Sequence, residues 1–299
     1  MVFWGGSFAA VRIALQYITP IELIYARFLP SAILLLLILG FGVIKEGNRS
    51  GFIRSLTRKH WLILIAASLF QVPFYNFCMN YAVSLIPPSW VGLVISLNPA
   101  SIAVFSVLLL RDKITIYRWL GIILSFTGLI YIAVNNNAIG MDGSELTLGA
   151  KLWGMLIAFG SVVSFGISTS LSKYLIQNSS SFKTMAWTII FGTVWIAPVG
   201  NRDYFVKIYN APLELWLAVG FLSVICTVAG FAAWYWAIKR WTVSRAGAFI
   251  YLVPIGALIV GNVMFDELMN LSVLLGVALV LGGVFLAGRK DRVFLKNTK

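Results

Sequence analysis

The stretch that decides the fold occurs twice in the chain. Residues 89–133 read SWVGLVISLNPASIAVFSVLLLRDKITIYRWLGIILSFTGLIYIA, and residues 244–288 read SRAGAFIYLVPIGALIVGNVMFDELMNLSVLLGVALVLGGVFLAG. A shift of 155 positions aligns the two without a gap. Matched residues are Ser89 and Ser244, Gly92 and Gly247, Pro99 and Pro254, Asp112 and Glu267, Gly121 and Gly276, and Gly128 and Gly283. An apolar chain with two copies of one helical unit is typical of transporters built from internal repeats.

The composition excludes a water-soluble globule. Of the 299 residues, 60% are hydrophobic and only 11% are charged, whereas soluble domains carry about 25% charged residues. A membrane-spanning helix needs roughly 20 mostly apolar residues. Ten such segments can be read, over residues 1–18, 21–44, 61–84, 89–110, 115–135, 149–176, 183–200, 213–238, 243–265 and 270–288. We therefore predict an all-α integral membrane protein with ten transmembrane helices.

The net charge of +13 indicates membrane orientation rather than binding to nucleic acid. If both chain ends lie on one side, most of the 23 Lys and Arg residues fall into loops and the tail on that side. Loops on the opposite side keep only Lys151, Arg202 and Lys207. Because Lys and Arg concentrate on the cytoplasmic side of membrane proteins, we expect a multi-pass protein of the cell membrane with both termini cytoplasmic.

Five spans per copy give the two copies opposite orientations, so they form two inverted five-helix repeats. The predicted units are residues 1–135 and 149–288, with an extracytoplasmic linker at 136–148 and a basic cytoplasmic tail at 289–299. The loop after span 4 reads Arg111-Asp112-Lys113, whereas its second copy reads Asp266-Glu267-Leu268, so only the cytoplasmic copy is basic. Two related halves of similar energy can open to either side, as alternating access requires.

Matched prolines predict bends in spans 4 and 9. A proline inside a helix removes a backbone hydrogen bond, and unpaired carbonyls at membrane depth are tolerated only beside protein or a water-filled cavity. Pro99 and Pro254 are therefore candidates for gating or kinks, and Ser96, Asn98 and Tyr251 for cavity lining. A packing kink without ligand contact is the alternative. The glycines of spans 5 and 10 allow close helix approach, between the repeats or between two copies in a homodimer.

Several motifs, in their order and spacing, resemble the EamA-type members of the drug/metabolite transporter superfamily. They are Phe3-Trp4-Gly5-Gly6-Ser7-Phe8, Pro20, Arg27-Phe28, Leu97-Asn98-Pro99 and Asp112, then Tyr235-Trp236-Ala237-Ile238-Lys239, Leu252-Val253-Pro254 and Glu267, with the paired glycines. The resemblance covers essentially the whole chain. It implies a central cavity formed by helices 1, 3, 4, 6, 8 and 9, and transport of small metabolites, commonly outward. The first span is barely long enough to cross, which leaves a start upstream of Met1 open.

Ionisable side chains inside a bilayer are costly and mark functional sites. No carboxylate falls at the middle of a predicted span, which disfavours a carboxylate-based proton switch. Arg12 and Arg27 do lie inside spans. Arg27 could reach back to the interface, pair with Glu22, or meet an anionic substrate group, and Arg12 has similar options. Asp112 and Glu267 could cap or gate helix ends, or serve the surface alone.

Neutral polar and aromatic residues complete the candidate substrate-binding site. They are Trp4, Ser7, Tyr75, Asn76, Asn80, Ser161, Ser164, Ser168, Thr227, Trp234 and Tyr235. Aromatic faces beside hydroxyls and amides suit a neutral, zwitterionic or amphipathic solute. Membrane helices also use such side chains to bond neighbouring helices, and each position has this alternative.

We therefore expect a transporter that moves a small metabolite, such as an amino acid or amine, by alternating access, with export favoured. A channel-like facilitator is the alternative. An intramembrane enzyme would need a nucleophile–base or metal constellation, yet the only histidine is His60. No catalytic residue, metal or cofactor is predicted; the expected partners are the substrate and the lipid bilayer.

Overall fold

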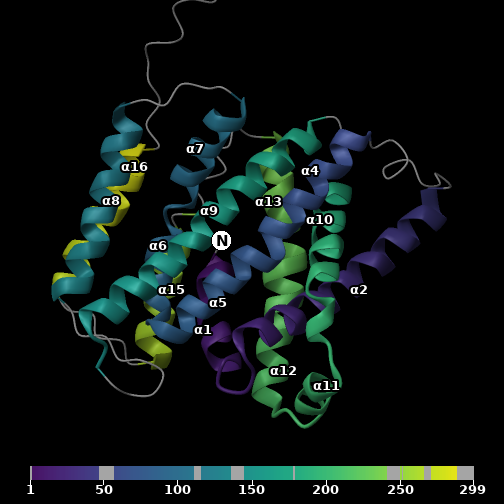
Figure 1. Ribbon diagram of the computed structural model, residues 1–299, viewed down its shortest axis with the longest axis horizontal. Coiled ribbons are helices and arrows are strands. Elements are labelled where there is room, and N and C mark those ends of the chain that lie inside the picture. Colours follow the sequence, from purple (N-terminus) through teal and green to yellow (C-terminus); the bar gives the residue numbers. More distant parts are fainter. Residues whose placement is uncertain are drawn as a thin grey trace, which may run out of the picture.

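The computed structural model describes residues 2–46, 57–110, 116–135, 145–177, 179–240, 250, 252–265 and 271–287. Helices dominate this part of the chain and pack into one bundle (Figure 1). Within the described residues, four continuous helical runs are long and apolar enough to cross a bilayer, at Pro20–Phe41, Arg58–Leu85, Leu148–Ile176 and Leu213–Arg240. This is the architecture of an integral membrane protein.

Each predicted span contains helix in the described residues. The elements are α1 Val2–Ala14, α2 Pro20–Glu46, α4 Arg58–Leu69, η1 Phe70–Phe74, α5 Tyr75–Leu85, α6 Pro88–Ile95, α7 Asn98–Leu110, α8 Ile116–Asn135, α9 Leu148–Ile176, α10 Ser181–Trp195, η2 Ala197–Val199, α11 Arg202–Tyr209, α12 Leu213–Gly220, η3 Phe221–Ala229, α13 Gly230–Arg240, α15 Leu252–Phe265 and α16 Leu271–Ala287. That all ten spans cross the bilayer stays a prediction.

Two of the long helices change from α to π geometry at related positions. The π-helix η1 lies between α4 and α5, and η3 lies between α12 and α13. The shift of 155 residues places η1 on the second half of η3. Side chains bond the loosened backbone: Asn76 Nδ2 donates to Gln71 O at 3.2 Å, and Thr227 Oγ1 donates to Leu222 O at 2.8 Å. Such π segments often lie at functional sites.

The bend predicted in span 4 is an interruption between two helices. α6 ends at Ile95 and α7 begins at Asn98, so Pro99 stands in the first turn of α7. The first N–H groups of a helix have no partner within it, and proline there removes no helical hydrogen bond. Pro254 likewise stands in the first turn of α15. Pro99 therefore marks a helix start and does not kink the middle of a continuous helix. For Pro254 a bend stays a prediction, because Tyr251, the residue before α15, lies outside the described residues.

A short helix occupies the break predicted between spans 7 and 8. This helix, α11, packs its Tyr204 ring edge-on against Tyr25 of α2, with 5.1 Å between ring centroids. Burial raises the pKa of the Tyr204 phenol to about 12. On the exposed side, Lys207 Nζ lies 2.7 Å from Glu22 Oε1. The sequence pattern, read as a loop, did not reveal this helix.

Helices α8 and α16 lie side by side at one edge of the bundle (Figure 1). Glycines permit their close contact. A Cβ atom on Gly128 would lie 2.8 Å from the Gly276 carbonyl oxygen, and one on Gly283 would meet the Gly121 carbonyl oxygen. The glycines singled out in the sequence therefore meet within one chain.

The neighbouring glycines Gly282 and Gly283 provide a matched test of this contact. A Cβ atom on Gly283 would lie 2.6 Å from the backbone nitrogen of Ser125, whereas one on Gly282 would meet nothing within 4 Å. We expect Gly283→Ala to destabilise the protein by about 1–3 kcal/mol because it overpacks the interface. Gly282→Ala should be neutral or stabilising, since alanine favours helices. Thermal unfolding in detergent measures both, and equal melting temperatures would contradict the packing.

Candidate functional site

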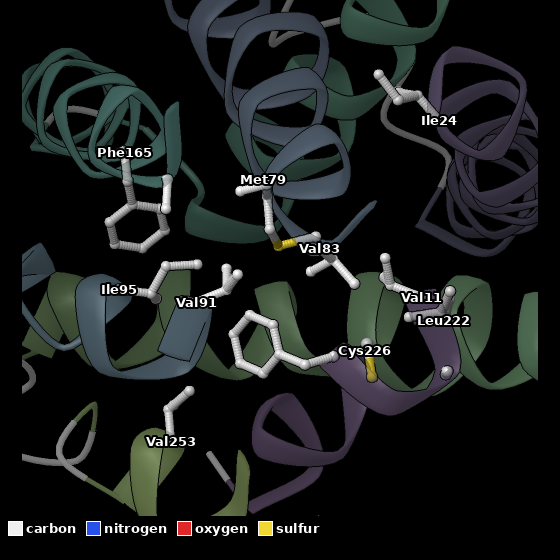
Figure 2. Packing of buried hydrophobic residues seen from close by; sticks show 14 of the residues in the cluster. Val11, Ile24, Met79, Val83, Val91, Ile95, Phe165, Leu222, Cys226 and Val253 are labelled. Carbon is white, nitrogen blue, oxygen red and sulfur yellow. The ribbon is translucent and has the colours of Figure 1, made fainter. Parts of the chain in front are cut away.

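A narrow cavity lies where helices from both halves of the chain meet. Its empty space is about 410 Å³ when the part open to solvent is included, and only about one water molecule fits inside it. Its lining residues are Trp4, Ser7, Phe8, Arg27, Tyr75, Met79, Ile95, Asn98, Phe165, Phe231, Ile250 and Val253. Figure 2 shows four of them, Met79, Ile95, Phe165 and Val253, converging from four helices. The cavity is thus mainly apolar, with a few polar groups.

One wall of the cavity is an ordered aromatic corner on α1. The indole Nε1 of Trp4 donates to the carbonyl oxygen of Cys226 at 2.8 Å, and Ser7 Oγ donates to the Trp4 carbonyl at 2.6 Å. The Trp4 ring tilts against Phe231, with centroids 5.4 Å apart. These contacts fix the indole, so it offers a rigid apolar face to a solute.

The most consequential polar group is the guanidinium of Arg27. The residue is only 5% exposed. Its Nε donates to Thr227 Oγ1 at 2.7 Å, and Nη1 donates to Asn76 Oδ1 at 3.3 Å. Among the described residues no carboxylate lies within 4.0 Å of it, and Glu22 pairs instead with Lys207. Of the three alternatives that the sequence left open, the pair with Glu22 is not formed, and contact with an anionic group of a solute stays a prediction.

Asn98 supplies a hydrogen-bond acceptor, whereas Arg27 supplies donors. It stands at the start of α7, beside the break in span 4, and is 3% exposed. Its Oδ1 has no hydrogen-bond partner among the described residues. A buried acceptor without a donor is unfavourable by about 1–3 kcal/mol. The arrangement therefore favours a solute that brings a donor group to this oxygen.

The structure brings five of the candidates from the sequence to the cavity, namely Trp4, Ser7, Arg27, Tyr75 and Asn98. Asn76 touches it only through Arg27. That these side chains contact a solute stays a prediction.

Other candidates bond neighbouring groups and are absent from the cavity wall. Asn80 Nδ2 donates to Pro20 O at 3.1 Å, and Ser168 Oγ donates to Gln71 Oε1 at 2.5 Å. The hydroxyl of Tyr235 lies 2.9 Å from Ser172 Oγ.

Further candidates lie behind the wall or outside the described residues. Trp234 packs against Trp4 and Phe165, with centroids 6.3 and 5.7 Å away. Ser96 Oγ donates to Leu93 O at 2.6 Å. Ser164 is buried, Arg12 is half-buried in the last turn of α1, and none of these residues lines the cavity. The candidates Asp112, Tyr251 and Glu267 lie outside the described part of the chain.

Sequence reasoning missed the apolar part of the wall. These residues are Phe8, Met79, Ile95, Phe165, Phe231, Ile250 and Val253. In a span where nearly every residue is apolar, no sequence signal separates a cavity wall from a packed or lipid-facing surface.

The profile of the EamA-like transporter family matches residues 1–134 and again residues 152–289. The chain belongs to this family. It is a membrane transporter of the drug/metabolite transporter superfamily, and the resemblance inferred from its motifs is confirmed.

Known proteins resemble this EamA transporter over nearly its full length. An uncharacterized transporter of Archaeoglobus fulgidus is 24% identical over 290 residues, which cover 97% of this chain and 96% of the relative. A probable terminal-alkyne amino-acid exporter of Streptantibioticus cattleyicolor is 23% identical over 290 residues, covering 97% and 91%. A crystal structure with 19% sequence identity superimposes with a TM-score of 0.61, over 95% of this chain and 92% of the other. The last comparison shows that the fold is shared.

The bond between Thr227 and Arg27 can be tested by removing one hydroxyl. We expect Thr227→Val to lower the free energy of unfolding by about 2 kcal/mol, because a buried cationic donor loses its acceptor. Thr127→Val is the matched control, since Thr127 is exposed and bonds only Ile123 O of its own helix. Thermal unfolding in detergent compares them. An equal effect of the two changes would show that the Arg27 contact adds nothing to stability.

Proposed function

We propose that this EamA transporter moves a small zwitterionic or neutral metabolite across the cell membrane by alternating access, with export as the favoured direction. The observation that carries the proposal is the cavity shared by both halves of the chain. Trp4, Tyr75 and Asn98 line it from the first half, and Phe165 and Phe231 from the second. A change in how the halves meet would therefore change the access to a solute bound between them.

Contacts between α8 and α16 support a two-fold relation between the halves. The shift of 155 residues aligns Gly121 with Gly276, and Gly128 with Gly283. In space, Gly128 meets Gly276 and Gly121 meets Gly283. This exchange of partners is what a two-fold axis between equivalent surfaces produces. It also means that the two helices run antiparallel, as inverted repeats require.

The residues between these glycines lie where the two-fold axis would pass. Ser125 Oγ donates to the carbonyl oxygen of Val280 at 3.0 Å. Val280 is the residue that the shift of 155 places on Ser125. A residue next to an axis contacts its own counterpart, so this bond supports the inverted repeat.

A second pair of contacts repeats between the halves. On α1, a Cβ atom at Gly5 would lie 2.7 Å from Gly256 Cα of α15. On α9, a Cβ atom at Gly166 would lie 2.9 Å from the carbonyl carbon of Ser101 on α7. The shift of 155 aligns Ser101 with Gly256. Spans 1 and 9 therefore meet much as spans 6 and 4 do, which supports two structurally equivalent halves.

The chemistry of the cavity favours a metabolite with both apolar and polar parts. Aromatic and aliphatic side chains form most of its wall, and Arg27, Asn98 and Ser7 supply polar groups. The relative from Streptantibioticus cattleyicolor is named a probable amino-acid exporter, which supports an amino acid as the solute here. A channel-like facilitator remains the second candidate, and the narrowness of the cavity disfavours it.

The orientation of the repeats predicts where two marker positions lie. We expect the chain end at Lys299 in the cytoplasm and Gly143, in the linker between the units, on the outer side. Reporter domains that are active on only one side of the membrane, inserted at each position, measure this. If both reporters are active in the same compartment, the halves are not inverted.

Transport itself is tested with purified protein in liposomes and a panel of metabolites. We expect saturable uptake with trans-stimulation by at least one solute. Asn98→Ala should lower its rate about tenfold, since a hydrogen bond to the solute is lost, and Trp234→Ala should alter rate or selectivity because Trp234 supports the Trp4 wall. The control Thr127→Val should transport normally. Flux that rises linearly with concentration, without trans-stimulation, would indicate a channel. Unchanged transport by both variants would show that the solute does not bind in this cavity.

A further inference from the structure

The cation of Arg27 is buried without an opposite charge among the described residues. The Thr227 hydroxyl and the Asn76 amide oxygen, which accept hydrogen bonds from it, are neutral. A buried charge is strongly unfavourable unless it is paired, and in membrane spans such residues mark pathways for substrates. An anionic group of the solute would pair with the Arg27 guanidinium while the solute is bound, and the positive charge would be free again after release.

The geometry of Arg27 leaves donors for such a group. A guanidinium carries five N–H donors, and the two bonds to Thr227 and Asn76 use one on Nε and one on Nη1. Arg27 also lines the cavity, so an anionic group there comes within reach of the remaining donors. The planar fork of a guanidinium matches the two oxygens of a carboxylate.

The amide oxygen of Asn98, the second polar group considered, needs a hydrogen-bond donor, whereas Arg27 needs an anion. Asn98 Oδ1 is a buried acceptor without a donor among the described residues, and it lines the same space as Arg27. An ammonium group carries three N–H donors and no acceptor. A solute with adjacent carboxylate and ammonium groups answers both needs at once.

The cavity holds only about one water molecule in this structure, so an amino acid enters it only when the two halves move apart. The remaining wall then selects the rest of the solute. Phe8, Met79, Ile95, Phe165 and Phe231 line the cavity beside these two polar groups. No carboxylate belongs to the described lining residues, so a second positive charge would have no partner there. The surroundings therefore suit an apolar side chain and disfavour a basic one.

From this arrangement we infer that Arg27 binds the carboxylate, and Asn98 accepts from the ammonium, of an α-amino acid with an apolar side chain. The assignment rests on the proposed transport function and narrows its substrate class. Arg27 also joins α2 to η3 and α5, which is a structural role. If Arg27 has a structural role alone, replacing it should weaken the binding of all solutes equally. If it binds the carboxylate, replacing it should weaken only the binding of solutes that carry a carboxylate.

The first test uses the unaltered protein in lipid nanodiscs and isothermal titration calorimetry. The probes are L-leucine, L-isoleucine, L-valine, L-methionine, L-phenylalanine and L-tryptophan, followed by analogues of the tightest binder. We expect the carboxamide analogue to bind about 100-fold more weakly, since it loses the buried charge pair. The analogue without the amino group should lose about tenfold. Equal binding of acid and amide overturns the assignment of Arg27, and no binding by any of the six amino acids overturns the substrate class.

The second test compares Arg27→Gln with Arg240→Gln. Arg240 is exposed and stacks over Trp236, 4.4 Å from the ring centroid, so the same change there removes a charge outside the cavity. Arg27→Gln should bind the amino acid and its amide equally, and Arg240→Gln should keep the preference for the acid. A preference that persists in Arg27→Gln contradicts the assignment. If Arg27→Gln does not fold, the comparison of acid and amide on the unaltered protein decides.

A third variant isolates Asn98. Asn98→Leu should bind the amino acid no better than its deaminated analogue, while it keeps the preference for acid over amide. A loss of both preferences would show that the two groups do not act separately. In the liposome assay, transport of a solute that lacks a carboxylate would leave the proposed function intact and overturn this inference; no flux of any solute would overturn both.

Discussion

The buried guanidinium of Arg27 is the interaction on which the arrangement at the cavity depends. It reaches from α2 to Thr227 of η3 and to Asn76, which follows η1. One cation thus joins α2 to the π-helix η3 of the second half and to α5, which continues from η1 in the first half. Its two neutral partners hold the charge without cancelling it. The group is therefore fixed in place and still able to attract an anion.

Backbone that departs from α-helical geometry lies beside the cavity, and the bilayer explains why. Backbone groups without helical partners are tolerated at membrane depth only where protein or a cavity surrounds them. Tyr75 follows η1 directly, Asn98 follows the break after α6, and Phe231 comes just after η3. All three line the cavity. The departures from α geometry therefore place side chains at the wall of the cavity.

The sequence predicted the helices well, because hydropathy and breaks alone define apolar spans. It singled out Trp4, Ser7, Tyr75 and Asn98, which line the cavity, since polar or aromatic residues stand out in such spans. It could not separate these from Tyr235, whose bond to Ser172 of a distant helix leaves no local pattern. The role of Arg27 stayed open for the same reason, because Thr227 lies 200 residues away.

Alternating access requires the cavity to open to each side of the membrane in turn. Ser7→Cys, in a protein with Cys78→Ala and Cys226→Ala, places a single thiol on the cavity wall. The measurement is its labelling by a membrane-impermeant thiol reagent, applied to one face at a time. Alternating access predicts labelling from either face, and transported solute should slow the labelling from both. Labelling from one face alone under every condition would contradict it.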